Sequence, residues 1–175
     1  MRIAGEQVTA YERDGFLVLE NFIRGDDCDA LRAHAEELVR DFDPTGVVSI
    51  FSTHEQTRTS DDYFLESGDK ICFFFEENAF LPDGTLRQSK ERSINKIGHA
   101  LHDLDPEFDK FSRTPQIKQL VSDLEIADPL LPHLSRENRS PRSRHAYTLH
   151  VVEASAFYPK DNWLQPSAEM APRGF

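Results

Sequence analysis

The histidine side chains are the first candidates for metal binding in this sequence, because a neutral imidazole is among the commonest metal ligands in proteins. His99 and His102 lie three residues apart in the stretch SINKIGHALHDL, residues 93–104. Apolar residues recur in this stretch at helical spacing, which predicts a helix. Two residues three apart on a helix share a face, so the two imidazoles could chelate one ion. The alternative is that both histidines have ordinary structural roles.

Another histidine lies near a carboxylate on a second predicted helix. This helix is expected to begin at the Gly25-Asp26 turn, with Asp26 as its cap, and to stop before Pro44. His34 and Glu36 are two residues apart on it, and such side chains diverge by about 200° around the helix axis. They therefore cannot hold the same metal ion.

The segment LPHLSRENRSPRSRHAYTLHVVEAS, residues 131–155, combines a histidine with several arginines. His133 could offer an imidazole to a metal, and a guanidinium such as that of Arg144 matches a carboxylate bidentately. Considered alone, His133 is an ordinary loop histidine and the arginines of RSPRSR form a solvated basic cluster. Lys96, considered alone, is an exposed lysine on the predicted 93–104 helix.

Both helices and strands are predicted in the chain, and the expected fold class is α+β, with N-terminal helices and strands. β-Branched or aromatic runs bounded by polar residues predict strands at 16–23, 46–53, 70–78 and 145–155. A short helix is expected at 5–14, and another from Thr114, where Thr114 caps and Pro115 fits the first helical position. Its buried stripe is expected to consist of Ile117, Leu120, Val121 and Leu124. Residues 54–69 and 127–144 are expected to form loops.

Length and composition limit the functional classes. The 175 residues suffice for one domain, and a net charge of -11 argues against nucleic acid as a partner. Cys28 and Cys72 are too few and too far apart for a disulfide framework, and both are expected to be reduced, buried thiols. No signal-peptide run or membrane-spanning stretch is present, so an intracellular, cytoplasmic location without membrane association is expected.

Four segments together resemble the phytanoyl-CoA dioxygenase domain-containing proteins. They are DGFLVLENFI, DYFLESGDKICFFFEENAF, SINKIGHALHDLDPEF and SRHAYTLHVVEAS followed by NWLQPSAE. The resemblance covers most of residues 10–126 and 133–169, in the order of the family. It implies an Fe(II)- and 2-oxoglutarate-dependent oxygenase on a double-stranded β-helix, a jelly-roll or cupin barrel, that hydroxylates a small-molecule substrate.

The resemblance also implies roles for single residues. The family pattern His-x-Ser, followed some nine residues later by Arg, is matched by His133, Ser135 and Arg144. By this resemblance His133 corresponds to the distal iron ligand, while Ser135 and Arg144 correspond to residues that bind 2-oxoglutarate. Lys96 in SINKIGHAL matches a lysine that also contacts this cosubstrate in the family. The resemblance gives His99 and His102 no such role.

The sequence departs from the family at the remaining iron ligands. The family carries a His-x-Asp pair on an early barrel strand, and no His-x-Asp occurs in this chain. We therefore expect residues 1–175 to form a single domain of this type, with much of the central barrel missing between about 126 and 133. The expected product is a shortened, inactive form with an incomplete jelly roll. The alternative is a non-catalytic module that self-associates or binds a partner such as the full-length protein.

Overall fold

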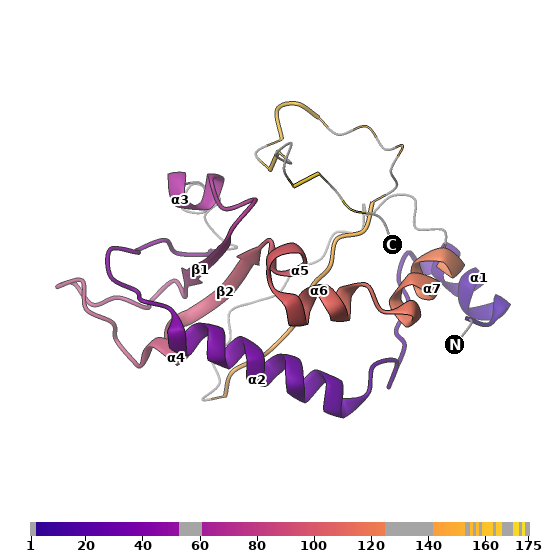
Figure 1. The fold of residues 1–175 in the computed structure, drawn as a ribbon, viewed down its shortest axis with the longest axis horizontal. Coiled ribbons are helices and arrows are strands. Elements are labelled where there is room, and N and C mark those ends of the chain that lie inside the picture. The colour runs from indigo at the N-terminus through magenta and orange to yellow at the C-terminus, as the bar shows by residue number, and fades with distance from the viewer. Residues whose placement is uncertain are drawn as a thin grey trace.

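The computed structural model describes residues 3–52, 61–124 and 142–152, together with residues 155, 157, 159–162, 164–165, 170–171 and 173. Within these residues the chain forms helices of various lengths around one small sheet, which confirms the α+β class (Figure 1). The elements are α1 (Gly5–Asp14), α2 (Gly25–Asp41), α3 (Asp62–Leu65), β1 (Ile71–Phe75), α4 (Lys90–Ser93), β2 (Ile94–His99), α5 (Leu101–Leu104), α6 (Pro106–Ser112) and α7 (Pro115–Leu124). In the described ranges no helix has the length and apolar character needed to cross a membrane.

The sheet is an antiparallel pair, β1 with β2, in which Phe73 lies opposite Ile97 and Phe74 opposite Lys96. Phe74 and Phe75 are fully buried, so β1 forms the centre of the core. The strand predicted at 70–78 is thereby confirmed. The helix predicted over 93–104 is wrong, because its first half is β2 and only Leu101–Leu104 is helical. Pairing with the buried aromatic strand outweighs the helical spacing of a few apolar residues.

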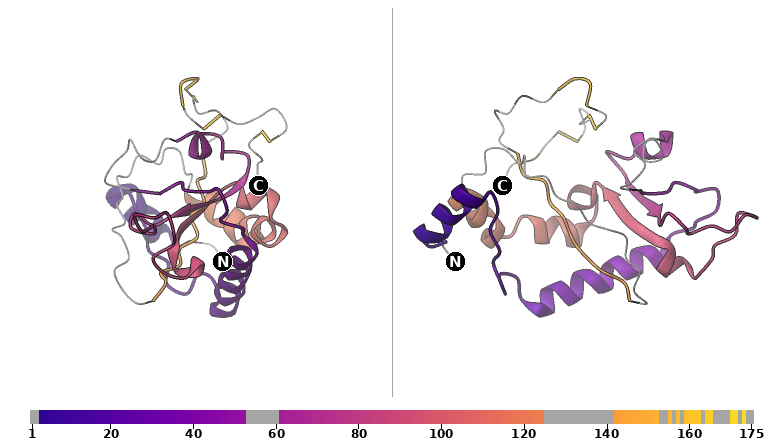
Figure 2. Two further views of the ribbon diagram at one scale, coloured as in Figure 1. Left: turned by 90° about the vertical axis from the view of Figure 1, so that its left-hand side faces the viewer. Right: turned by 180° about the vertical axis from the view of Figure 1, so that it is seen from behind.

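Three other strand predictions have different outcomes. The stretch 16–23 forms no strand, and its Phe16 and Val18 are exposed. The stretch 46–53 contributes one parallel bridge, from Ile50 to Phe75, in its described part. The C-terminal prediction is extended over 142–152 without strand pairing among the described residues, and Figure 2 shows it running past α6. A strand needs a partner to satisfy its backbone, and the stretches 16–23 and 142–152 have no paired neighbour among the described residues.

Helix α2 begins at Gly25 with Arg24 in the cap position, so the predicted Asp26 cap is wrong. Asp26 instead lies in the first helical turn, where a carboxylate is favoured by the helix dipole. The predicted end before Pro44 is confirmed, and Lys90 satisfies that end by donating to the carbonyls of Arg40 at 2.7 Å and Phe42 at 2.6 Å.

Helix α6 carries the side-chain cap that α2 lacks. The Asp105 carboxylate accepts hydrogen bonds from the backbone N–H groups of Glu107 at 3.0 Å and Phe108 at 3.1 Å. Its second oxygen lies 2.8 Å from Nε2 of His34, which ties α2 to the start of α6. The start of helix α7 follows the prediction, since Pro115 is its first residue and the Thr114 hydroxyl accepts from the N–H of Ile117 at 3.4 Å. Its predicted buried stripe is confirmed only at Ile117, because Leu120, Val121 and Leu124 are only partly buried.

Two further predictions concern single side chains. Both cysteines are free thiols, but only Cys72 is buried, so the expectation of a buried Cys28 is wrong. Cys28 lies in the first turn of α2, whose core-facing side is elsewhere, with Val39 the buried residue of that helix. Burial raises the pKa of the Cys72 thiol, which keeps it protonated near neutral pH.

Candidate functional site

Lys96 lies in the middle of β2 with its ammonium group among aromatic rings. Its Nζ is 4.6 Å from the ring centre of Phe51, 5.6 Å from that of Phe64 and 6.0 Å from that of Phe74. The three rings come from the 46–52 stretch, from α3 and from β1. Ring faces attract a cation through their quadrupole. We call Lys96 and these three rings the lysine cage.

Gly98 makes room for the stem of Lys96. Residues two apart on a strand point to the same face, so the Lys96 side chain can fold along the strand over Gly98. A Cβ added at Gly98 would lie 3.0 Å from Cε of Lys96, which is closer than real Cβ atoms normally approach. The absence of a side chain at Gly98 therefore allows the ammonium to reach its position in the cage.

Burial lowers the pKa of the Lys96 ammonium. Desolvation lowers this pKa from 10.5 to about 8. In the described part of the chain no carboxylate forms an ion pair with it, whereas Lys70 pairs with Glu66 and Lys90 donates to two carbonyl oxygens. Within the described ranges the ammonium is thus a desolvated cation that contacts ring faces and no carboxylate. A carboxylate entering the cage would supply the missing counter-charge.

His99 follows at the end of β2 and faces Ser67. The Ser67 hydroxyl donates its one proton to the carbonyl of Phe64 at 2.6 Å, and the same oxygen lies 2.8 Å from Nδ1 of His99. Since Ser67 has no second proton to give, it accepts from His99, which assigns the imidazole proton to Nδ1. Nε2 therefore carries the ring's lone pair.

Desolvation, aided by the positive charge of Lys96, lowers the pKa of His99 to about 4. The imidazole is consequently neutral at physiological pH. His150 contributes in the same direction, so the 142–152 segment lies within electrostatic range of His99. Lys96, His99 and His150 thus share one region, with Phe64 packed edge-on against His99 at 5.2 Å between ring centres.

The structure does not support chelation by His99 and His102. His99 is in β2, while His102 is in α5, is 42% exposed at its side chain and lies 3.3 Å from the carboxylate of its neighbour Asp103. Among the described residues no group of three or more histidine, cysteine or acidic side chains could hold a metal ion. The structural interpretation of these two histidines is the better one. His34 likewise pairs with Asp105 rather than sharing an ion with Glu36.

The four residues implied by the resemblance are placed unequally. Lys96 is at the centre of the cage. Arg144 is described and exposed in the 142–152 segment, whereas the ring contacts of the Lys96 ammonium are made by Phe51, Phe64 and Phe74. His133 and Ser135 lie outside the described residues.

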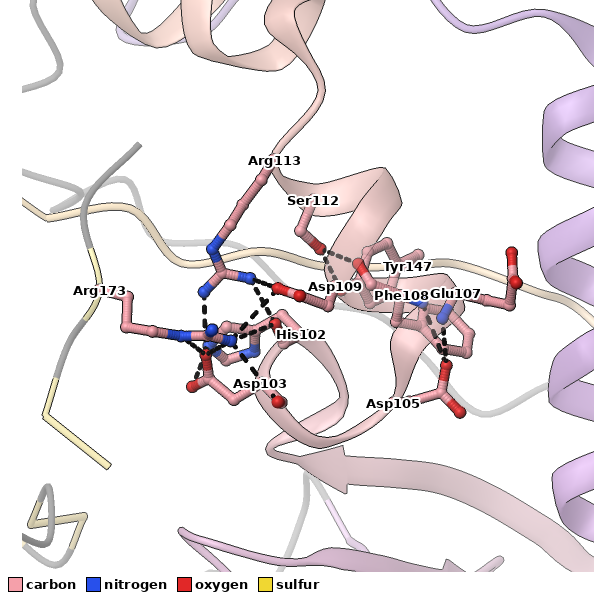
Figure 3. Close-up of polar contacts among 10 residues, drawn as sticks. All are labelled: His102, Asp103, Asp105, Glu107, Phe108, Asp109, Ser112, Arg113, Tyr147 and Arg173. Atoms are coloured by element: carbon pink, nitrogen blue, oxygen red, sulfur yellow. Dashed lines mark hydrogen bonds and ion pairs between the residues drawn. The ribbon is translucent and has the colours of Figure 1, made fainter. Parts of the chain in front are cut away.

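A second polar cluster lies at the junction of α5 and α6 (Figure 3). Arg113 donates to Asp103 at 2.9 Å, to the carbonyl of His102 at 2.5 Å and to Asp109. Arg173, from the C-terminal end, pairs with Asp103 at 2.6 Å and with Asp109 at 3.2 Å. Two guanidinium groups therefore face two carboxylates, and the charges balance. We call these four side chains the arginine–aspartate cluster, and their closed pairing indicates a structural role.

The 142–152 segment is attached next to this cluster through Tyr147. The Tyr147 hydroxyl is 2.8 Å from that of Ser112, and its ring centre lies 4.9 Å from that of Phe108 (Figure 3). The ring centre of Phe111 is 5.9 Å away. Beyond this contact, an open apolar groove of about 320 Å³ lies between the 142–152 segment and α7. Its walls include the predicted stripe of α7, namely Ile117, Leu120, Val121 and Leu124.

Sequence reasoning found Lys96 but not its surroundings. The rings of Phe51, Phe64 and Phe74 are far apart in the chain, and the sequence alone does not show that they converge. One signal was available. Lys96 and Gly98 occupy alternate positions of a stretch that also holds the β-branched Ile94 and Ile97, and a strand would place the glycine beside the long lysine side chain.

Comparison with known proteins places this geometry in a family. The family model described as phytanoyl-CoA dioxygenase (PhyH) matches residues 11–127, which include the whole lysine cage. The chain is 44% identical over 131 residues to a phytanoyl-CoA dioxygenase domain-containing protein 1 homolog of Dictyostelium discoideum, covering 75% of this chain and 46% of that protein. It is 45% identical over 126 residues to a phytanoyl-CoA dioxygenase of Arabidopsis thaliana, covering 72% of this chain and 44% of that protein. A mouse phytanoyl-CoA dioxygenase domain-containing protein 1 is 41% identical over 134 residues, with 74% and 46% covered. The chain thus spans slightly under half the length of these relatives.

Proposed function

The chain belongs to the phytanoyl-CoA dioxygenase family, and on that premise we propose that its lysine cage binds a carboxylate of 2-oxoglutarate. The observation that carries the proposal is the Lys96 ammonium, desolvated among three rings without an acidic partner in the described structure. A carboxylate is the ligand that this arrangement lacks, and a buried ammonium gains most from one. Ser135 and Arg144 are the further candidates for holding the cosubstrate.

The described residues do not fit an iron site of two histidines and a carboxylate. No suitable cluster of metal ligands occurs among them, and the Nδ1–H group of His99 donates to the Ser67 hydroxyl. His133 is the candidate distal ligand, but the sequence has no His-x-Asp to accompany it. We therefore propose that the protein is a shortened form of an Fe(II)- and 2-oxoglutarate-dependent dioxygenase, with an incomplete jelly roll, that is inactive as written.

Cosubstrate binding can be tested apart from turnover. Isothermal titration of the full chain with 2-oxoglutarate should show weak binding that Lys96→Met abolishes and Lys96→Arg retains in part. The matched control is Lys70→Met, which removes an exposed lysine paired with Glu66 and should leave the titration unchanged. Equal binding by wild type and Lys96→Met would refute the carboxylate site.

The proposed inactivity has its own measurement. Purified chain supplied with Fe(II), ascorbate and 2-oxoglutarate should form no succinate above the protein-free blank. Turnover that requires iron and disappears on His133→Ala would overturn this part of the proposal, since it would mean that other ligands complete the metal site.

A second candidate function is a non-catalytic module that binds a second copy or a longer form of the same protein. It is favoured by the open apolar groove and by the 142–152 segment, which has no strand partner in the described structure. Such a segment can accept a neighbouring strand. Light scattering on a sizing column tests it, because a strictly monomeric chain that fails to capture its longer form would exclude this function.

A further inference from the structure

The lysine cage holds an amine whose surroundings differ from those of other lysines in the chain. Lys90 donates to two backbone carbonyls, and Lys70 is exposed and paired with Glu66. Lys96 instead meets only ring faces among its described contacts, and its side chain is half-buried, so part of it remains accessible. Ring faces interact with the ammonium form but place no hydrogen-bond acceptor on it. Loss of a proton therefore breaks no hydrogen bond at this site.

We propose that Lys96 is a covalent acylation site, whose amine accepts the acyl group of small acyl thioesters. The geometry supplies what an amine nucleophile needs, namely a desolvated nitrogen that pairs with no carboxylate among the described residues and lies in a defined position beside the rings. The stem lies over Gly98, where an added Cβ would come within 3.0 Å of Cε, so a side chain at this position would push against it. The apolar ring walls would also accommodate the hydrocarbon part of an acyl group.

The reaction balances without an oxidant or a metal. Neutral Nζ attacks the thioester carbonyl carbon, the C–N bond forms and the C–S bond breaks. The thiolate leaves and takes up the proton that the nitrogen loses, so the products are an amide and a free thiol. The pKa of about 8 supports this step, because roughly a fifth of the amine is neutral near pH 7.4, against about one part in a thousand for an ordinary lysine.

Acylation would also change the charge of the lysine cage. An amide carries no charge, so the cage would lose the cation that a carboxylate ligand needs. This consequence, unlike the acylation itself, rests on the proposed function. If both hold, thioester chemistry would switch off cosubstrate binding at Lys96.

The experiment uses the full chain with the S-acetyl thioester of N-acetylcysteamine, and with acetyl-CoA as a second donor. Digestion after glutamate yields the peptide 92–107, in which Lys96 is the sole lysine, so mass spectrometry assigns its acetylation without ambiguity. We expect Lys96 to react at least about tenfold faster than the exposed Lys70 and Lys118, with a rate that rises through pH 8 and then levels off. A Lys96 rate no greater than that of Lys118, or one that still climbs steeply above pH 9, would overturn the proposal.

A variant that leaves Lys96 in place makes the test specific to geometry. Gly98→Ala should displace the stem and lower the Lys96 rate towards that of Lys118, with a thermal melt confirming that the variant folds. If Gly98→Ala does not fold, Phe51→Leu, which removes the nearest ring, tests the same geometry. An unchanged acylation rate of Lys96 in a folded variant would count against the proposal. Adding 2-oxoglutarate separates the two ideas. Protection of Lys96 supports the carboxylate site, whereas fast acylation without protection would refute the proposed function and leave the acylation site standing.

Discussion

The lysine cage and the arginine–aspartate cluster differ in whether their charged groups have partners of opposite charge. In the cluster, Arg113 and Arg173 face Asp103 and Asp109, and every charged group has an opposite neighbour (Figure 3). In the cage, one ammonium lies among rings without an acidic partner in the described residues. The cluster lowers the energy of the folded chain by pairing charges that are partly exposed, whereas the cage keeps a desolvated charge that no described carboxylate neutralises. Functional sites are often marked by such perturbed groups, and balanced ion networks are usually structural.

The largest effect should come from removing the cage's charge. Lys96→Met should reduce 2-oxoglutarate affinity by at least tenfold and raise the free energy of unfolding by about 1 kcal/mol, because a desolvated charge is replaced by an apolar side chain of similar length. Titration calorimetry and urea unfolding measure the two quantities. A variant that loses stability instead would mean that the ammonium has a counter-charge, and the contrast with the cluster would disappear.

The Asp105 cap, which adjoins the cluster, offers the largest effect on stability alone. Asp105→Ala removes two hydrogen bonds to the start of α6 and the partner of His34, and it should lower the free energy of unfolding by about 2 kcal/mol. Asp26→Ala is the matched control, since Asp26 makes no cap hydrogen bond. Urea unfolding of both variants should separate them. Equal losses in the free energy of unfolding would show that the hydrogen bonds of the cap add no stability beyond that of an ordinary acidic residue in the first turn.

The pH dependence of stability should reveal the cage in the unmodified chain. The pKa of Lys96 is lowered to about 8 in the folded state, against 10.5 for the free side chain, so between these values the unfolded chain binds more protons than the folded one. Stability should therefore rise as pH increases from about 8 to 10.5, and this rise should be missing in Lys96→Met. Thermal melts across that range test it, and identical pH profiles would contradict a desolvated amine.

His34 should show the reverse sign at lower pH. Hydrogen bonding to Asp105 raises the pKa of His34, so its contribution to stability is complete below pH 6.5 and is lost as pH rises through the folded value. Melts of wild type and His34→Gln between pH 5 and 8 should converge at the upper end. Convergence at the lower end would mean that the imidazole is held neutral.

The smallest effect is expected for the exposed arm of the cluster. Arg173 is 48% exposed at its side chain, and solvent screens its ion pairs. Arg173→Ala should lower the melting temperature by roughly 1 °C, and the difference should vanish in high salt. Arg113→Ala, which removes a side chain that is only 24% exposed, should cost more. Equal effects for the two arginines would show that burial does not rank the pairs of this cluster.

Local signals in the sequence predicted the elements that local interactions determine. The α7 start at Pro115, the end of α2 before Pro44 and the aromatic strand β1 each depend on neighbouring residues, and all three are confirmed. The predicted helix over 93–104 failed because its strand half depends on β1, more than 20 residues earlier in the chain. The same limit applies to the site. The family motif identified Lys96, but the convergence of Phe51, Phe64 and Phe74 is a tertiary fact.

Tyr147 has a consequence for how this fold tolerates change in chain length. Its bond to Ser112 and its ring contacts hold the chain against α6 on one side of residues 125–141, and α7 ends at Leu124 on the other. The contacts at both attachment points are made by residues outside 125–141, and the free-energy cost of closing a loop grows by only about 0.6 kcal/mol for each doubling of its length. This junction is therefore a place where evolution, or an engineer, could insert or delete whole strands while the N-terminal half keeps its architecture.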